Sequence, residues 1–180
     1  MNCGRLALSL VLLLGFEPAA LAISNNSWDD ISTVTELSLV GLALGTPVVK
    51  DDWDGAGQAA LSIGLSAGLA EFGKALVHAE RPDNSDNNSF PSGHTSVAFA
   101  SATTVYRRYG WQLGFPAYAV AAFTGSARVA ARKHHWYDVL AGAVIGTGSG
   151  WLFTKPFNDR VQVSPWADSK GGGLMVSMVW

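Results

Sequence analysis

Three short groups of polar residues could do chemistry in this sequence, and each lies at the end of an apolar segment. The first group is Lys74 and Arg81, seven positions apart, with Pro82 directly after them. In a continuous helix these two cations would project from one face, nearly two turns apart, and could hold one anion. Two solvated surface charges would have the same spacing, so the pair alone does not identify a site.

The second group is Pro91-Ser92-Gly93-His94, directly before an apolar stretch that is expected to be helical. Ser92 can cap that helix, and Gly93 allows a ligand to approach the backbone closely. The free N–H groups of a first helical turn bind anions, and His94 would stand beside them. A serine cap with an incidental histidine is common, so this group is also weak evidence by itself.

The third group is Arg128, His134 and Asp138. In a helix, Asp138 would lie one turn after His134, accept a hydrogen bond from one imidazole nitrogen and leave the other nitrogen free. An ordinary surface pair has the same spacing. Together, however, the three groups contain three cations, an anion-binding helix start and two histidines, one with a carboxylate partner. Such a set describes a pocket for a tetrahedral or trigonal-bipyramidal oxyanion, and phosphate is the expected ligand.

The ordered pattern Lys74-x6-Arg81-Pro82, Pro91-Ser92-Gly93-His94 and Arg128-x5-His134-x3-Asp138 resembles the signature of the type 2 phosphatidic acid phosphatase and vanadium haloperoxidase superfamily. It covers residues 74–138. Two features depart from the family pattern. Ala127 stands where a serine commonly precedes the arginine, with Ser126 one position earlier, and the loop between Pro82 and Pro91 is short. All ionisable groups of the pattern are present.

The resemblance implies an all-α fold, a compact bundle of five to six helices, and a phosphatase that needs no metal and no cofactor. By resemblance, His134 attacks phosphorus and forms a phosphohistidine, Asp138 fixes its tautomer, and His94 serves as general acid and base. The substrate phosphate would be bound by Lys74, Arg81, Ser92, Gly93 and Arg128. Vanadate would bind as a mimic of phosphate.

Other interpretations use the same residues. A vanadate-dependent haloperoxidase would hold vanadate in this pocket as its cofactor, although the small size of the chain favours a phosphatase. A non-catalytic phospholipid-binding or structural bundle gives no reason for His94, His134 and Asp138 all to be present. A register error of one residue would exchange His135 for His134, but only His134 has the four-residue spacing to Asp138. His78 is expected to be structural or to lie at the rim.

Length and composition narrow the class of protein. The chain has 180 residues, of which 48% are hydrophobic and 14% charged, with a net charge of −2 and one cysteine. These values exclude a disordered tail, a small domain stapled by disulfides and a nucleic-acid binder that acts through a basic surface. We expect one helical domain over residues 23–180.

Residues 1–22 are typical of a secretory signal peptide, with Arg5, an apolar run over 6–16 and the ending Ala20-Leu21-Ala22. A first membrane anchor is disfavoured because a bilayer crossing needs roughly 20 apolar residues. We therefore expect an exported protein, periplasmic or on the periplasmic face of a membrane. Its substrate would be a phosphorylated lipid or a small phosphate ester. The sequence leaves open its oligomeric state and whether it is soluble or embedded.

Hydrophobic periodicity and turn residues predict the helices and loops that carry these groups. Helices are expected over 29–48, 57–80, 93–108, 114–132 and 136–154, with a loop over 81–91 because prolines and turn residues fill it. A small β-hairpin is expected within residues 160–180, with an unstructured tail as the alternative. The charged residues Arg107, Arg108, Arg132 and Lys133 are expected to face solvent or lipid head groups.

Overall fold

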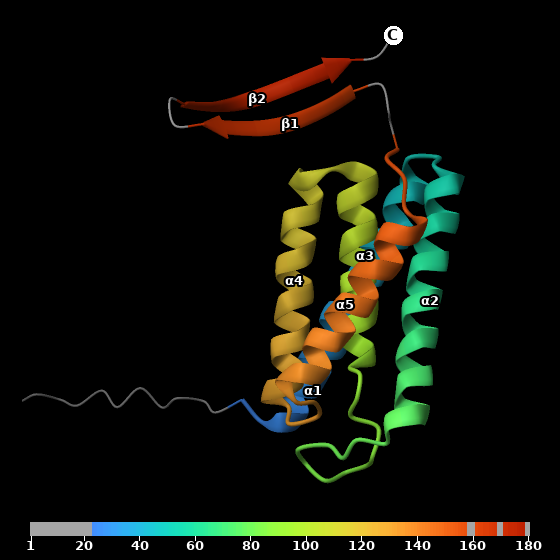
Figure 1. Ribbon diagram of the computed structural model, residues 1–180, viewed down its shortest axis with the longest axis vertical. Helices are drawn as coiled ribbons and strands as arrows, with labels where there is room; N and C mark the ends of the chain where they lie inside the picture. Colours follow the sequence, from blue (N-terminus) through green and yellow to red (C-terminus); the bar gives the residue numbers. More distant parts are fainter. Residues whose placement is uncertain (1–22, 158–160, 169–170, 179–180) are drawn as a thin grey trace, which may run out of the picture.

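The computed structural model describes residues 23–157, 161–168 and 171–178, so the predicted signal peptide lies outside the described residues. Five α-helices alternate in direction and form one bundle (Figure 1). Their bounds are α1 Asn25–Val49, α2 Trp53–Val77, α3 Gly93–Tyr109, α4 Trp111–Ala130 and α5 Trp136–Phe153. The expected all-α class is confirmed.

Side chains cap the start of three helices. Ser24 accepts a hydrogen bond from the backbone N–H of Ser27, Asp52 accepts one from Gly55, and Ser92 accepts one from Thr95. Such caps satisfy backbone donors that the first turn of a helix leaves free. α1 therefore starts at Asn25, four residues before the expected boundary, and α2 starts at Trp53 rather than at 57.

Helix α2 also ends earlier than expected. It stops at Val77, because His78 takes the left-handed conformation with φ of 47°. Arg81 therefore lies in the following loop and not on the helix that carries Lys74. The predicted reason for their proximity, a shared helical face, was wrong.

Helix α3 is the centre of the bundle and packs against each of the other four helices. Its contact with α5 is close because Gly142, Gly146 and Gly150 follow one another at four-residue intervals along α5. A Cβ atom on Gly142 would lie 2.5 Å from the carbonyl oxygen of Ser92. Small residues therefore set the distance between α5 and the start of α3.

A buried ion pair joins the elements at the end of the bundle that Figure 1 shows uppermost. Arg108, only 9% exposed, donates to both carboxylate oxygens of Asp52 and to the carbonyl oxygens of Lys155 and Pro156. Tyr109 donates to the same carboxylate at 2.9 Å. The expectation that Arg108 faces solvent was wrong, because this arginine connects the start of α2 to the segment after α5.

The chain continues beyond the bundle into an antiparallel pair of strands, β1 Val161–Asp168 and β2 Gly171–Met178. The register pairs Val161 with Met178 and Asp168 with Gly171. This confirms the hairpin predicted within residues 160–180. Among the described residues, the strands make no contact with the helices.

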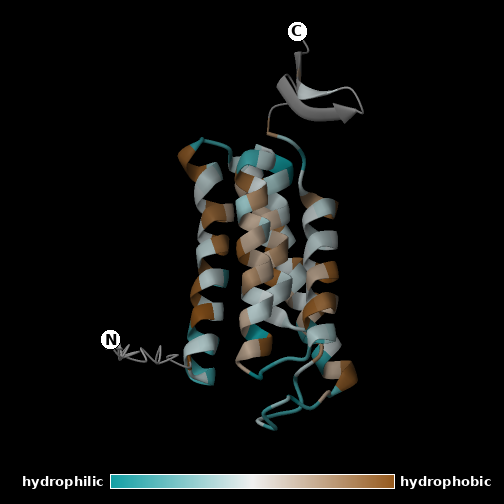
Figure 2. Ribbon diagram, turned by 90° about the vertical axis from the view of Figure 1, so that its left-hand side faces the viewer, coloured by the Kyte–Doolittle hydropathy of each residue, from teal (hydrophilic) through white to brown (hydrophobic). Residues whose placement is uncertain are grey.

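Among the helices of the described residues, two are long and apolar enough to cross a membrane, α1 and α2. Only 22% and 17% of their most apolar windows are buried inside the bundle, so these side chains mostly point outward. Figure 2 shows hydrophobic residues spaced along the outer helices, with the hydrophilic loop that follows α2 at the lower end. The exposed large side chains include Val34, Leu37, Leu61, Phe72, Leu140 and Val144.

Candidate active site

The three predicted groups meet at the end of the bundle opposite the hairpin (Figure 1). The starts of α3 and α5, the ends of α2 and α4, and the loop over 78–92 converge there. The start of α1 lies at the same end. Asp29 and Arg128, which are 99 positions apart in the sequence, are bonded to each other there.

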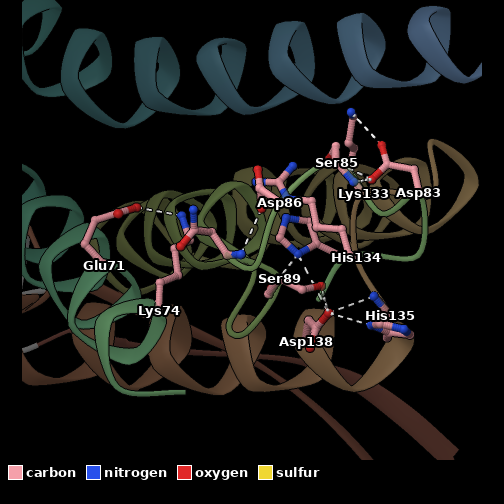
Figure 3. Close-up of polar contacts among 12 residues, drawn as sticks. Glu71, Lys74, Asp83, Ser85, Asp86, Ser89, Lys133, His134, His135 and Asp138 are labelled. Carbon is pink, nitrogen blue, oxygen red and sulfur yellow. Dashed lines mark hydrogen bonds and ion pairs between the residues drawn. The ribbon is translucent and has the colours of Figure 1, made fainter. Parts of the chain in front are cut away.

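His134 lies just before α5, with its side chain 2% exposed. Its Nδ1 atom is 2.7 Å from the carbonyl oxygen of Ser89 (Figure 3). A carbonyl oxygen can only accept, so Nδ1 carries the proton and donates it. The Nε2 atom of His134 therefore keeps a free lone pair, which a nucleophile requires.

Asp138 does not make the hydrogen bond to His134 that the spacing predicts. Its Oδ2 atom lies 3.8 Å from Nδ1 of His134, because His134 precedes the first residue of α5 and the two do not stack one helical turn apart. Instead, Oδ2 accepts from the Ser89 hydroxyl at 2.5 Å and from the backbone N–H of His135 at 2.7 Å. The Asp138 side chain is fully buried.

Ser89 therefore connects the carboxylate to the histidine. Its hydroxyl donates to Asp138, its carbonyl accepts from His134, and its side chain is fully buried. Reasoning from the sequence missed this residue, although it stands two positions before Pro91. Only the fold places that segment of the loop against the start of α5.

The start of α3 has the expected form. Ser92 caps the helix and is fully buried, and its hydroxyl lies 2.9 Å from that of Thr95. A Cβ atom on Gly93 would lie 3.3 Å from the ammonium group of Lys74. Lys74 therefore reaches the backbone of the first turn of α3, where N–H groups favour an anion.

The three predicted cations are each held by a carboxylate. Lys74 pairs with Glu71 at 2.6 Å and Arg81 with Asp86 at 2.7 Å, while Arg128 pairs with Asp29. These ion pairs hold the long cationic side chains in place at the site.

Arg128 is 3% exposed and also donates to the hydroxyl of Ser32 at 3.2 Å. Its Nε atom is buried and has no hydrogen-bond partner in the described part of the chain. A buried guanidinium with a free donor is a good binding group for an oxyanion.

Burial and the charges of nearby cations lower the pKa of both histidines in the site. Burial and the charge of Arg128 lower the pKa of His134 to about 3 and the pKa of His94 to about 4. Arg81 contributes at both rings, and Lys74 contributes at His94. The structure thus brings together Lys74, Arg81, His94, Arg128 and His134, and both imidazoles are neutral near pH 7.

Helix α1 provides further contacts that the sequence did not predict. The Nε2 atom of His94 lies 3.3 Å from the hydroxyl of Thr33 and 3.5 Å from the carboxylate of Glu36. No motif marks these residues, because they belong to an apolar helix far from the three groups in sequence.

The two remaining histidines lie outside this set. His135 is 35% exposed, caps α5 and stacks on Tyr137 with ring centroids 4.9 Å apart. His78 ends α2.

Lys133 is bonded to Asp83 at 2.7 Å, and this hydrogen bond holds the pKa of Asp83 below its usual range. Lys133 therefore fastens the loop to the turn before α5 and does not simply face solvent. Within the described ranges, no cluster of three or more histidine, cysteine or acidic side chains could hold a metal ion.

Comparison of the sequence with known proteins found relatives that are lipid A phosphatases by name. The chain is 37% identical over 128 residues to the lipid A 1-phosphatase of Porphyromonas gingivalis, covering 67% of this chain and 28% of that protein. It is 36% identical over 88 residues to the lipid A 4′-phosphatase of Helicobacter pylori, covering 49% of this chain and 44% of that protein. The chain thus matches less than half the length of either relative.

The crystal structure of Aquifex aeolicus LpxE has a similar fold. The two chains superpose with a TM-score of 0.61 at 22% identity, covering 71% of this chain and 83% of the other. The family sequence model of the PAP2 superfamily matches residues 55–162, which is more than half of the chain and includes all three predicted groups. This chain therefore belongs to the PAP2 superfamily.

Proposed function

We propose that this protein is an exported phosphatase that hydrolyses a phosphomonoester or diphosphate group of a lipid through a phosphohistidine on His134. The observation that carries the proposal is the hydrogen bond from Nδ1 of His134 to the carbonyl of Ser89. That bond leaves Nε2 as a free nucleophile in a site where three cations and the start of α3 meet.

In the proposed reaction, Nε2 of His134 attacks phosphorus and the bond to the leaving oxygen breaks. His94 protonates that oxygen, and it later takes a proton from the water that hydrolyses the phosphohistidine. Lys74, Arg81 and Arg128, with the amides of Gly93 and His94 and the Ser92 hydroxyl, would stabilise the charge on the equatorial oxygens. Loss of one such preorganised donor typically costs about 3–4 kcal/mol of transition-state stabilisation.

The proposed mechanism uses no metal ion. Three positive side chains can neutralise a transferring phosphoryl group in the way that a divalent metal does in other enzymes. The buried and unpaired Nε atom of Arg128 supports this assignment, because it is a charged donor available to a phosphate oxygen.

A lipid substrate and a membrane location are supported by two observations. The relatives named above act on lipid A according to their names, and α1 and α2 point apolar side chains outward. We propose that the protein associates with the periplasmic face of a membrane, with the active site accessible to a lipid head group.

Phosphate release from a panel of substrates tests the proposal. The panel contains lipid A, phosphatidate, phosphatidylglycerol phosphate, an isoprenyl diphosphate and a water-soluble ester, each assayed with EDTA and with vanadate. We expect release from at least one lipid, inhibition by vanadate and no inhibition by EDTA. Loss of activity in EDTA, restored by a divalent metal, would contradict the metal-free mechanism. Halide oxidation by the vanadate-loaded protein without phosphate release would favour a haloperoxidase instead.

A further inference from the structure

One carboxylate in the site has no role in the mechanism so far. Glu36 on α1 has its side chain 15% exposed, and its Oε2 atom lies 3.5 Å from Nε2 of His94. Thr33, one turn earlier on α1, places its hydroxyl 3.3 Å from the same nitrogen. Helix α1 therefore determines the surroundings of one ring nitrogen of His94.

The position of Glu36 needs an explanation, because a carboxylate near a phosphate site repels the substrate. It is not needed to pair Arg128, since Asp29 and Ser32 already bond that side chain. Within the described residues, the imidazole of His94 is the one basic group recorded in contact with the Glu36 carboxyl group. Glu36 also lies outside residues 55–162, which the family model matches.

The charged groups around Glu36 and His94 determine which of the two side chains holds a titratable proton. His94 is faced by groups from four parts of the fold, namely Asp29 and Glu36 of α1, Lys74 of α2, Arg128 of α4 and Arg81 of the loop. Burial raises the pKa of Glu36 to about 7, and burial with Arg128 lowers the pKa of His94 to about 4. Between these two pH values the carboxyl group of Glu36 is protonated and the imidazole of His94 is neutral.

A general acid must regain the proton that it gives to the leaving group, and the neutral imidazole of His94 carries only one N–H proton. We propose that Glu36 is a positioning residue for His94 that holds, beside its Nε2 atom, the proton that replaces the one His94 gives to the leaving group. This inference rests on the proposed phosphatase function, in which His94 is the acid.

The Nδ1 proton of His94 passes to the leaving oxygen as the phosphorus–oxygen bond breaks, and the electron pair of that bond stays on the oxygen. The Glu36 carboxyl proton moves to Nε2 of His94, which leaves Glu36 as a carboxylate. When water attacks the phosphohistidine, His94 accepts a water proton at Nδ1 and returns the Nε2 proton to Glu36.

Leaving groups of different basicity test this inference. An alkyl phosphate needs protonation of its leaving oxygen, whereas p-nitrophenyl phosphate releases a stable anion. We expect Glu36→Gln, which keeps the side-chain volume, to lower kcat/KM for the alkyl ester by about tenfold or more and to affect the nitrophenyl ester little. The matched control is Asp30→Asn, because Asp30 is an exposed carboxylate on the same helix.

The possible outcomes distinguish a failure of the role inferred for Glu36 from a failure of the proposed phosphatase mechanism. An equal loss on both esters, or no loss on either, would overturn the role of Glu36. The variant His94→Gln must itself show the leaving-group pattern. If it does not, the general-acid assignment of His94 fails, and if it does while Glu36→Gln does not, only the present inference fails.

A second variant covers the case in which Glu36→Gln does not fold. Glu36→Asp keeps a carboxyl group but withdraws it from His94 by one methylene. We expect a smaller loss with the same dependence on the leaving group. A uniform loss on both esters from a folded Glu36→Asp protein would also overturn the inference.

Discussion

The Nδ1 atom of His134 lies 2.7 Å from the carbonyl oxygen of Ser89, whereas the carboxylate of Asp138 lies 3.8 Å from the same nitrogen. Asp138 is connected to the histidine through Ser89, whose hydroxyl donates to the carboxylate at 2.5 Å and whose carbonyl oxygen accepts from Nδ1 of His134. The orientation of the proposed nucleophile therefore depends on a loop residue between the carboxylate and the imidazole.

Replacement of Ser89 tests this dependence. Ser89→Ala removes the hydroxyl that donates to buried Asp138 but keeps the carbonyl that accepts from His134. A buried carboxylate that loses one donor is destabilised by about 1.5–3 kcal/mol, so we expect kcat to fall about tenfold or more. Steady-state kinetics should reveal the loss, with Asn87→Ala as an exposed control in the same loop. Wild-type kcat in Ser89→Ala would contradict the linking role of the hydroxyl.

Replacement of His134 tests the nucleophile. His134→Ala should abolish turnover while the five helices still form, because His134 lies in the turn before α5 and belongs to no helix. Phosphate release and the circular dichroism spectrum measure the two effects. The wild-type protein, but not the variant, should carry a covalently bound phosphoryl group after rapid denaturation. Unchanged phosphate release from the purified variant would refute the assignment.

Stability should fall in mild acid because His134 is buried in its neutral form. Burial lowers the pKa of His134 to about 3, whereas the pKa of a histidine in an unfolded chain is about 6.5. Below a pH of about 6.5 the unfolded chain therefore binds more protons than the folded chain, so the free energy of unfolding decreases as the pH falls toward about 3. Urea unfolding at several pH values should detect this slope. The slope should be smaller in His134→Gln, and an identical slope in both proteins would argue against a neutral buried His134.

The ion pair at the far end of the bundle should contribute stability without contributing to catalysis. Asp52→Asn keeps a good helix cap but leaves Arg108 buried without a charged partner, which typically costs about 3–5 kcal/mol. Urea unfolding should show this loss, while kcat of the folded protein stays unchanged. Asp54→Asn, an exposed change in the first turn of α2, is the control. A large fall in kcat with unchanged stability would contradict this separation.

Close packing of α5 on α3 should be needed for both stability and activity. Gly142→Ala would place a Cβ atom 2.5 Å from the carbonyl oxygen of Ser92, so the start of α3 must move. We expect a destabilisation of about 1–3 kcal/mol, as for other overpacked cores, together with a lower kcat. Gly148→Ala on the same helix meets no atom within 4 Å and should be neutral or stabilising by up to about 1 kcal/mol. Equal effects of the two changes on unfolding and kcat would exclude the packing explanation.

Some of the fold and site could be predicted from the sequence. The cap of α3 at Ser92, the loop bounded by Pro82 and Pro91 and the five helical segments depend on neighbours within a few residues. Local hydrogen bonding and backbone preference determine such features, so they can be recognised in a linear chain. The three motif groups could be recognised for the same reason, because each is a short run of residue types at a definite spacing.

Partners distant in the chain could not be predicted in this way. The bond between Ser89 and His134 joins positions 45 apart, and the contact between Thr33 and His94 joins positions 61 apart. The sequence likewise predicts a solvent-facing Arg108, whereas the packed bundle buries this arginine against Asp52. The amino-acid order sets which chemical groups are present, and helix packing sets which of their atoms meet. Contacts between distant segments depend on how five helices pack, and no local pattern specifies that packing.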